Sequence, residues 1–170
     1  MKWFGACMIL LCTSWFGHHY SMLYTKRERQ LKQLIFSFHI MDAEIVHNQR
    51  PLQETFSIIS EKLADPLQQY YQSLVDEMET IITNLSVIWE KETDNLLQIS
   101  ALQKDEIIVL KQFGHTLGDY ALIKQHEQIT LTITYLEQIL EQAMEERKKY
   151  SKLYTKLGIF FGIFLVILLM

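Results

Sequence analysis

Hydrophobic residues are concentrated at the two ends of the chain. Residues 3–24 contain no Asp, Glu, Lys or Arg. As a helix they would reach about 33 Å, which is enough to cross the hydrocarbon core of a bilayer. Lys2 ahead of this stretch also fits the start of a cleaved signal peptide, but no clear small-x-small cleavage site follows it. We therefore expect an uncleaved transmembrane helix at residues 3–24.

The second hydrophobic stretch is residues 153–170, where every residue after Lys156 is apolar. As a helix it would reach about 27 Å, with the Lys156 ammonium extending to the lipid headgroups. A second transmembrane helix is expected here, and a buried core helix is the alternative. Four glycines would allow close packing between helices in the bilayer, namely a G-x-x-x-G pair in the second span and two glycines in the first: Gly158, Gly162, Gly5 and Gly17.

Between these ends, apolar residues recur every three or four positions, as on one face of a helix. The first stripe continues from the first span without a helix breaker. Pro51 ends it by disfavouring helical geometry at Arg50. Later stripes predict helices that begin near residues 52, 66, 86, 104 and 122, with Ser86 capping the fourth and the fifth spanning 104–116 before Gly118. The residues of the first stripe are Leu31, Leu34, Phe38, Met41 and Ile45.

The last of these helices has the most regular pattern. From Leu122 its stripe alternates steps of four and three, as in long antiparallel packing. His126 falls on this stripe, which predicts a buried, hydrogen-bonded histidine, and Trp89 is likewise expected in the core. The predicted fold is all-α: a cytoplasmic bundle of about six helices at residues 25–152. Its long first and last helices are continuous with two transmembrane helices.

The distribution of charge orients this arrangement. All twenty acidic residues lie between Glu28 and Glu146. An acidic middle should be repelled by nucleic acid, so we expect no nucleic-acid partner. Basic residues flank the middle, which places it in the cytoplasm with both termini outside and the flanking bases on anionic lipid. These membrane-surface residues are Lys26, Arg27, Arg29, Lys32, Arg147, Lys148, Lys149, Lys152 and Lys156.

The chain carries no recognisable catalytic chemistry. It lacks the P-loop, the dinucleotide-binding glycine pattern, H-E-x-x-H and G-x-S-x-G. Cys7 and Cys12 both lie in the first hydrophobic stretch, so neither a disulfide framework nor a cysteine metal site is expected in the middle. We therefore expect no enzyme activity, cofactor or metal. Asp42 and Glu44 could form a docking point or simply a solvated face.

Several short motifs follow one another along the chain. The first comprises Asp42-Ala43-Glu44-Ile45 and Arg50-Pro51-Leu52 with Glu54. The later ones are Trp89-Glu90, Asp105 with Gly114, Leu117-Gly118 and Tyr154-Thr155-Lys156-Leu157-Gly158. Taken in this order, the motifs resemble the stage III sporulation protein AB family, and the resemblance covers nearly the whole chain. The chain departs from it at Asp119-Tyr120-Ala121-Leu122, which is less polar than the family's pattern.

This resemblance implies a component of the mother-cell side of the channel complex that links mother cell and forespore during engulfment. The family's soluble domain is similar to the cytoplasmic helical domain of the type II secretion platform protein. By the same analogy the partners would be a cytoplasmic secretion-type ATPase and other membrane subunits of the channel. The candidate contacts for the partner are Asp42, Glu44, Arg50 and Asp119. A two-span sensor or adaptor that passes a signal to a cytoplasmic partner is the alternative function.

Overall fold

The computed structural model describes residues 2–80, 84–117, 122–151, 153 and 160, with the backbone alone for residues 2–21, 122–123 and 151. These residues form six α-helices and two π-helical segments, with no strand among them, which confirms the prediction of an all-α chain. The elements are α1 (Lys2–Met41), η1 (Asp42–His47), α2 (Leu52–Lys62), α3 (Leu67–Thr80), α4 (Leu85–Ile99), α5 (Lys104–Gly114), α6 (Leu122–Glu146) and η2 (Arg147–Ser151).

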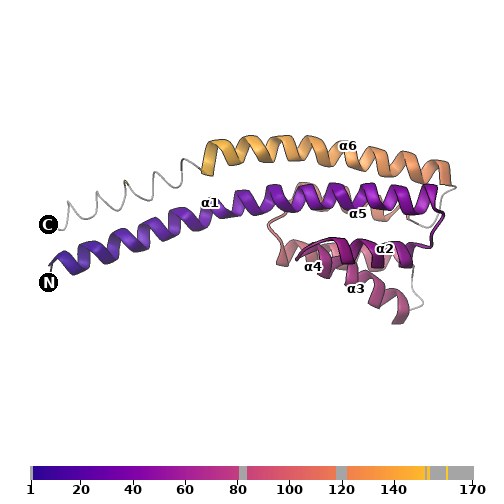
Figure 1. Cartoon of the computed structure of the whole chain (residues 1–170), viewed down its shortest axis with the longest axis horizontal. Helices are drawn as coiled ribbons and strands as arrows, with labels where there is room; N and C mark the ends of the chain where they lie inside the picture. The colour runs from indigo at the N-terminus through magenta and orange to yellow at the C-terminus, as the bar shows by residue number, and fades with distance from the viewer. Residues whose placement is uncertain (1, 81–83, 118–121, 152, 154–159, 161–170) are drawn as a thin grey trace. The chain divides into compact units, whose positions relative to one another are not determined.

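The chain divides into two compact units, one of residues 1–28 and 141–170 and one of residues 29–140. Within residues 29–140, α6 runs beside α1, and α2, α3 and α4 lie on the side of α1 away from α6 (Figure 1). The predicted α1 stripe is buried, with Leu31, Leu34 and Phe38 fully shielded from solvent. Phe38 reaches α5, where its ring contacts Phe113 with centroids 4.8 Å apart. α1 is therefore the central helix of this bundle.

Trp89 of α4 occupies the middle of an aromatic cluster. Its ring centroid lies 5.8 Å from Phe56 of α2, 5.6 Å from Tyr70 of α3 and 5.5 Å from Phe113 of α5. The indole Nε1 donates a hydrogen bond to the carbonyl oxygen of Leu110 at 2.7 Å, so its polar atom is satisfied although the side chain is fully buried. The expectation that Trp89 belongs to the core is confirmed.

The helix boundaries correct two details of the sequence prediction. Asn84, and not Ser86, caps α4: its Oδ1 accepts a hydrogen bond from the Ser86 backbone N–H at 3.1 Å. α5 ends at Gly114, two residues before the predicted boundary, because the Thr116 N–H turns back to the Phe113 carbonyl at 2.9 Å. Gly118 lies outside the described residues.

In the other unit, two ion pairs link α1 to the end of α6 and to η2. Arg27 pairs with Glu146 at 2.7 Å, and Arg147 pairs with Glu28 at 2.9 Å. The rings of Tyr24 and Tyr150 stack beside them at 5.8 Å. We call Arg27, Glu28, Glu146 and Arg147 the four-charge cluster. Arg27 and Glu28 are each only 5% exposed, so the first turns after the predicted span are held by charge pairing and not only by hydrophobic contact.

The membrane spans stay predictions. Among the described residues, no helix combines the length and the hydropathy needed to cross a bilayer. The predicted span 3–24 lies on α1, whose backbone is one unbroken helix from Lys2 to Met41. The predicted span 153–170 lies outside the described residues, apart from Leu153 and Phe160.

Candidate functional site

The segment that follows α1 is π-helical and carries two of the predicted partner contacts. In η1 the Asn48 N–H donates to the Ala43 carbonyl at 3.1 Å, five residues back, where an α-helix would bond four back. Single π-turns are frequent at functional sites, because the extra residue re-aims the side chains around it. Ile45 is buried beneath the segment, while Asp42 and Glu44 stay partly accessible on its outer side.

Polar contacts then join η1 to the loop before α2 and to α6. The Asp42 carboxylate lies 2.7 Å from Nδ1 of His126, within the range of a hydrogen bond or an ion pair. Glu44 pairs with the Arg50 Nε at 2.7 Å and accepts a hydrogen bond from the Asn48 amide at 2.9 Å. Arg50 also pairs with Glu54 of α2. We call these residues the η1 cluster: Asp42, Glu44, Asn48, Arg50, Glu54 and His126.

The η1 cluster surrounds a strained turn. Gln49 has a φ of 52°, in the left-handed region that costs a non-glycine residue about 1–2 kcal/mol. Its neighbours Asn48 and Arg50 both direct their side chains to Glu44, so these contacts hold the turn in place. Strained backbone of this kind clusters at functional sites.

Three of the four predicted partner contacts are thus brought together. Asp42, Glu44 and Arg50 belong to one cluster, and Asp119 lies outside the described residues. Sequence reasoning missed Asn48 and Glu54, although each is four positions from its partner, a spacing that signals pairing. The prediction of a buried His126 is wrong: the side chain is 50% exposed, because at this end of α6 it faces the Asp42 carboxylate and not the core.

The predicted membrane-surface residues divide into two groups. Lys26, Arg29 and Lys32 of α1 are exposed, as are Lys148 and Lys149 of η2. The structure corrects the prediction that Arg27 lies on the membrane surface, since its guanidinium is buried against Glu146. Arg147 is partly covered in its pair with Glu28. Lys152 and Lys156 lie outside the described residues, as do Gly158 and Gly162; Gly5 and Gly17 lie on the α1 backbone.

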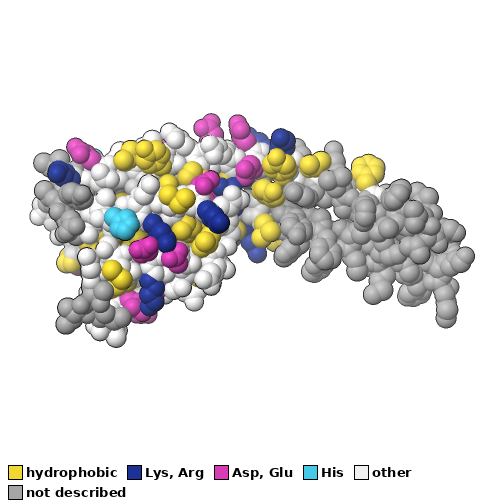
Figure 2. Space-filling view, turned by 180° about the vertical axis from the view of Figure 1, so that it is seen from behind, with side chains coloured by type: hydrophobic (Ala, Val, Ile, Leu, Met, Phe, Trp, Pro, Cys, Tyr) yellow, Lys and Arg dark blue, Asp and Glu magenta, His cyan; other side chains and the backbone are white. Residues whose placement is uncertain are grey.

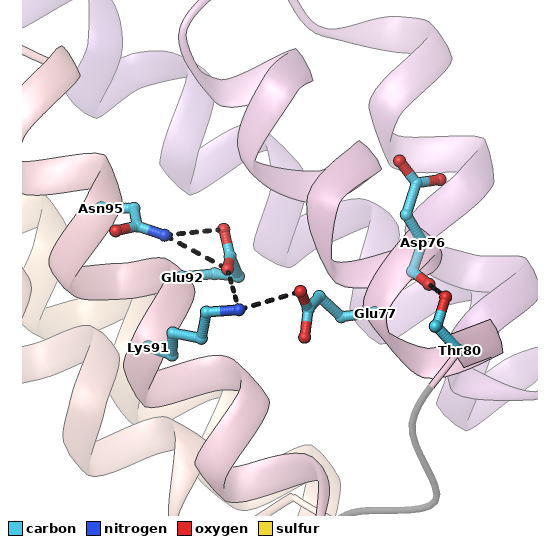
Figure 3. Close-up of polar contacts among 6 residues, drawn as sticks. All are labelled: Asp76, Glu77, Thr80, Lys91, Glu92 and Asn95. Carbon is cyan, nitrogen blue, oxygen red and sulfur yellow. Dashed lines mark hydrogen bonds and ion pairs between the residues drawn. The ribbon is translucent and has the colours of Figure 1, made fainter.

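A second polar surface lies between α3 and α4. Lys91 of α4 reaches Glu77 of α3 at 2.8 Å, and its ammonium is 3.7 Å from the Glu92 carboxylate (Figure 3). The hydrogen bond to Glu77 raises the pKa of Lys91. Glu92 is 7% exposed and accepts hydrogen bonds from the Asn95 amide at 3.2 and 3.3 Å. Beside Glu92 a groove of about 210 Å³ opens between the two helices.

This groove is small for a substrate or cofactor site, since pockets for drug-sized ligands are about 300–1,000 Å³. Within the described part of the chain, no group of three or more His, Cys, Asp or Glu side chains could hold a metal ion.

Comparison with known proteins gives a consistent family likeness. The family model of stage III sporulation protein AB matches residues 2–170. The chain is 33% identical over 137 residues to the stage III sporulation protein AB of Bacillus subtilis (strain 168), covering 81% of this chain and 80% of that protein. A solved structure of stage III sporulation protein AB (SpoIIIAB) is similar with a TM-score of 0.69 and 30% identity, over 73% of this chain and 98% of that one.

Proposed function

Because the chain belongs to the stage III sporulation protein AB family, we propose that it is a non-enzymatic, membrane-anchored platform subunit of the sporulation complex and that the η1 cluster docks a cytoplasmic secretion-type ATPase. A role in the sporulation complex follows from the family itself. Anchoring and docking are the finer parts of the proposal, and each has its own support in the chain.

The anchoring part rests on the ends of the chain. Residues 3–24 and 153–170 would lie in the membrane of the mother cell that faces the forespore, beside other membrane subunits of the channel. Exposed bases follow the first stretch and precede the second: Lys26, Arg29 and Lys32, then Lys148 and Lys149. The positive-inside rule therefore favours an orientation with the bundle in the mother-cell cytoplasm and both termini outside. An ATPase in the same compartment could then reach the bundle.

The docking part rests on one observation: three residues expected to contact the partner form a single ordered cluster on η1 and the loop after it. Arg50 is held between Glu44 and Glu54, so both carboxylates and the guanidinium are already oriented. A partner's charged side chains could exchange with these pairs without ordering a loop, which lowers the entropic cost of binding. Seventeen residues of α1 lie between Tyr24, the last residue of the predicted span, and the start of η1.

The experiment is a binding measurement between the full chain in lipid nanodiscs and the sporulation ATPase of the complex. The variant Asp42→Asn/Glu44→Gln removes two carboxylates that pair with His126 and Arg50. Its matched control is Glu90→Gln/Asp94→Asn, which removes two carboxylates paired with Lys111 of α5. The η1 variant should bind about tenfold more weakly or worse, equivalent to about 1.4 kcal/mol, and the control should bind as the wild type.

Two outcomes would overturn parts of this proposal separately. If the wild-type chain and the ATPase do not associate, the docking function fails. If they associate and both variants bind equally, the ATPase docks elsewhere and the η1 cluster is a structural turn.

A further inference from the structure

The groove between α3 and α4 contains a buried carboxylate that shares its nearest cation with a second carboxylate. Glu92 is 7% exposed and lines the groove with Asn95 of its own helix. The Asn95 amide donates hydrogen bonds to it at 3.2 and 3.3 Å. Lys91 pairs with Glu92 at 3.7 Å and more closely with Glu77 at 2.8 Å, so one ammonium serves two carboxylates (Figure 3). None of the residues that line this groove is basic.

A carboxylate withdrawn from water is stabilised best by a charge-assisted hydrogen bond. An ionised carboxylate offers about four acceptor positions, and Asn95 supplies one amide group to them. Burial and the neighbouring Tyr71 are the main causes that raise the pKa of the Tyr70 hydroxyl. The negative charge of Glu92, on the other side of the groove, raises it further. The chemistry of the groove therefore favours a cation.

The other walls of the groove narrow the choice of cation. Gln69, Tyr70 and Ser73 of α3 provide an amide, an aromatic ring and a hydroxyl, and Ile99 of α4 provides aliphatic surface above the buried Leu96. Ile99 is 52% exposed. An arginine side chain combines a planar guanidinium, which binds a carboxylate through two N–H groups, with a methylene stem that packs on apolar surface. A lysine side chain matches the charge but not the planar, forked geometry.

We infer that the α3–α4 groove binds one arginine side chain carried by a segment of a partner protein, with its guanidinium on Glu92 and its stem along Ile99. The volume of about 210 Å³ suits a single side chain better than a whole small-molecule ligand. The acidic sequence of this part of the chain supports a basic partner: residues 61–94 hold eight acidic and two basic residues. Figure 2 shows hydrophobic and charged side chains interspersed on one face of the molecule. This site shares no residue with the η1 cluster.

The test uses the full chain in nanodiscs and a blocked peptide, acetyl-Gly-Arg-Gly-amide, as the probe. Its control is the same peptide with citrulline, which keeps the shape of arginine and lacks its charge. NMR signals of the Asn95 and Gln69 side-chain amides report occupancy of the groove. The arginine peptide should give saturable shifts, and the citrulline peptide should bind about tenfold more weakly or not at all. Equal binding of the two peptides, or no saturable shift, would overturn the inference.

Two variants locate the binding. Glu92→Gln keeps the size of the side chain and removes its charge, so it should abolish the difference between the peptides. Glu90→Gln, an exposed position two residues earlier on α4, should leave that difference unchanged. If Glu92→Gln retains full preference for arginine, the guanidinium binds elsewhere and the inference is wrong. The peptide comparison on the wild-type chain needs no variant, so it decides the question even where Glu92→Gln does not fold.

Discussion

Gly114 lies directly against the indole ring of Trp89. A Cβ atom added to Gly114 would overlap Cδ1 of that ring and come within 2.8 Å of its Cγ. The ring cannot retreat easily, because Phe56, Tyr70 and Phe113 surround it and its Nε1 is bonded to the Leu110 carbonyl. The position therefore needs glycine because of its neighbour, and not because of its backbone angles.

Gly114→Ala should destabilise the bundle by about 1–3 kcal/mol, the usual cost of overpacking a core. Thermal unfolding of the full chain in detergent, followed by circular dichroism, measures this as a lower midpoint. Gln112→Ala, an exposed position on the same helix, is the control and should change little. Trp89→Phe in the Gly114→Ala background should recover part of the loss, since the smaller ring leaves room. Additive losses in the double variant would contradict the packing explanation.

The four-charge cluster predicts that exchanging the charges of two partners restores the stability that either single change removes. Arg27→Glu or Glu146→Arg alone places like charges together, and each should cost about 1–3 kcal/mol. This is below the cost of breaking a fully buried pair, because Glu146 is 41% exposed. The double exchange restores two pairs of opposite charge, now with two acids on α1 facing two bases at the end of α6 and the start of η2, so it should regain most of the stability. The unfolding midpoints of the four proteins give the coupling, and a double variant no better than its worse parent would refute it.

Two buried tyrosines predict loss of stability in alkali. Burial raises the pKa of the Tyr70 and Tyr71 hydroxyls well above the ordinary 10.0. Above pH 10 the unfolded chain loses these protons and the folded chain keeps them. The stabilising effect is therefore complete below pH 10 and declines as the pH rises, by about 1.4 kcal/mol per pH unit for each tyrosine.

Tyr71→Phe should make this decline shallower. Its direct cost is small, since Ser37 keeps its hydrogen bond to the Leu34 carbonyl. The raised pKa values of Lys91 and Lys111, caused by hydrogen bonds to Glu77 and Asp94, act in the same direction, so the variants must be compared with each other. Denaturant unfolding at several pH values is the measurement, with Tyr135→Phe at an exposed position as the control. An equal slope in wild type and Tyr71→Phe would argue against the prediction.

The left-handed turn at Gln49 predicts an unusual order of substitutions. Gln49→Gly removes strain at a φ of 52° but adds freedom to the unfolded chain, so its net effect should be near zero. Gln49→Val places a β-branched residue where it fits worst and should cost about 1–2 kcal/mol relative to Gly. Thermal midpoints of both variants decide this, and a Val variant as stable as the Gly variant would show that the turn is not strained.

Periodicity predicted the bundle because burial on a helix repeats with the helix. Leu31, Leu34 and Phe38 are buried where the stripe placed them. The same reasoning failed at His126. A stripe of apolar positions predicts which face of a helix points toward the core, but it does not predict at which residue the apolar surface packed against that face ends. At that level the neighbour of α6 is η1, and it presents a carboxylate.

The charge contacts were less predictable. Arg27 carries no local sign that it is buried, since its partner Glu146 lies 119 positions away. A basic residue next to a predicted span is therefore assigned to lipid by default. The η1 cluster was only partly visible, because π-helical geometry has no sequence signature and brings Asp42 and Glu44 to their partners in a way that α-helical spacing does not describe.

The π-turn at η1 also has a consequence for chain length. Such a turn accommodates one residue more than an α-helical turn, so η1 behaves as a single-residue insertion that the fold has retained. Ala43 is exposed, and replacing it should matter little. Deleting it should return the segment to an ordinary α-helical turn, because the extra residue that the π-turn holds would be gone while the residues on either side keep their places. Related sequences should therefore vary freely at this position in identity, and those that are one residue shorter should have a regular α-helix in place of η1.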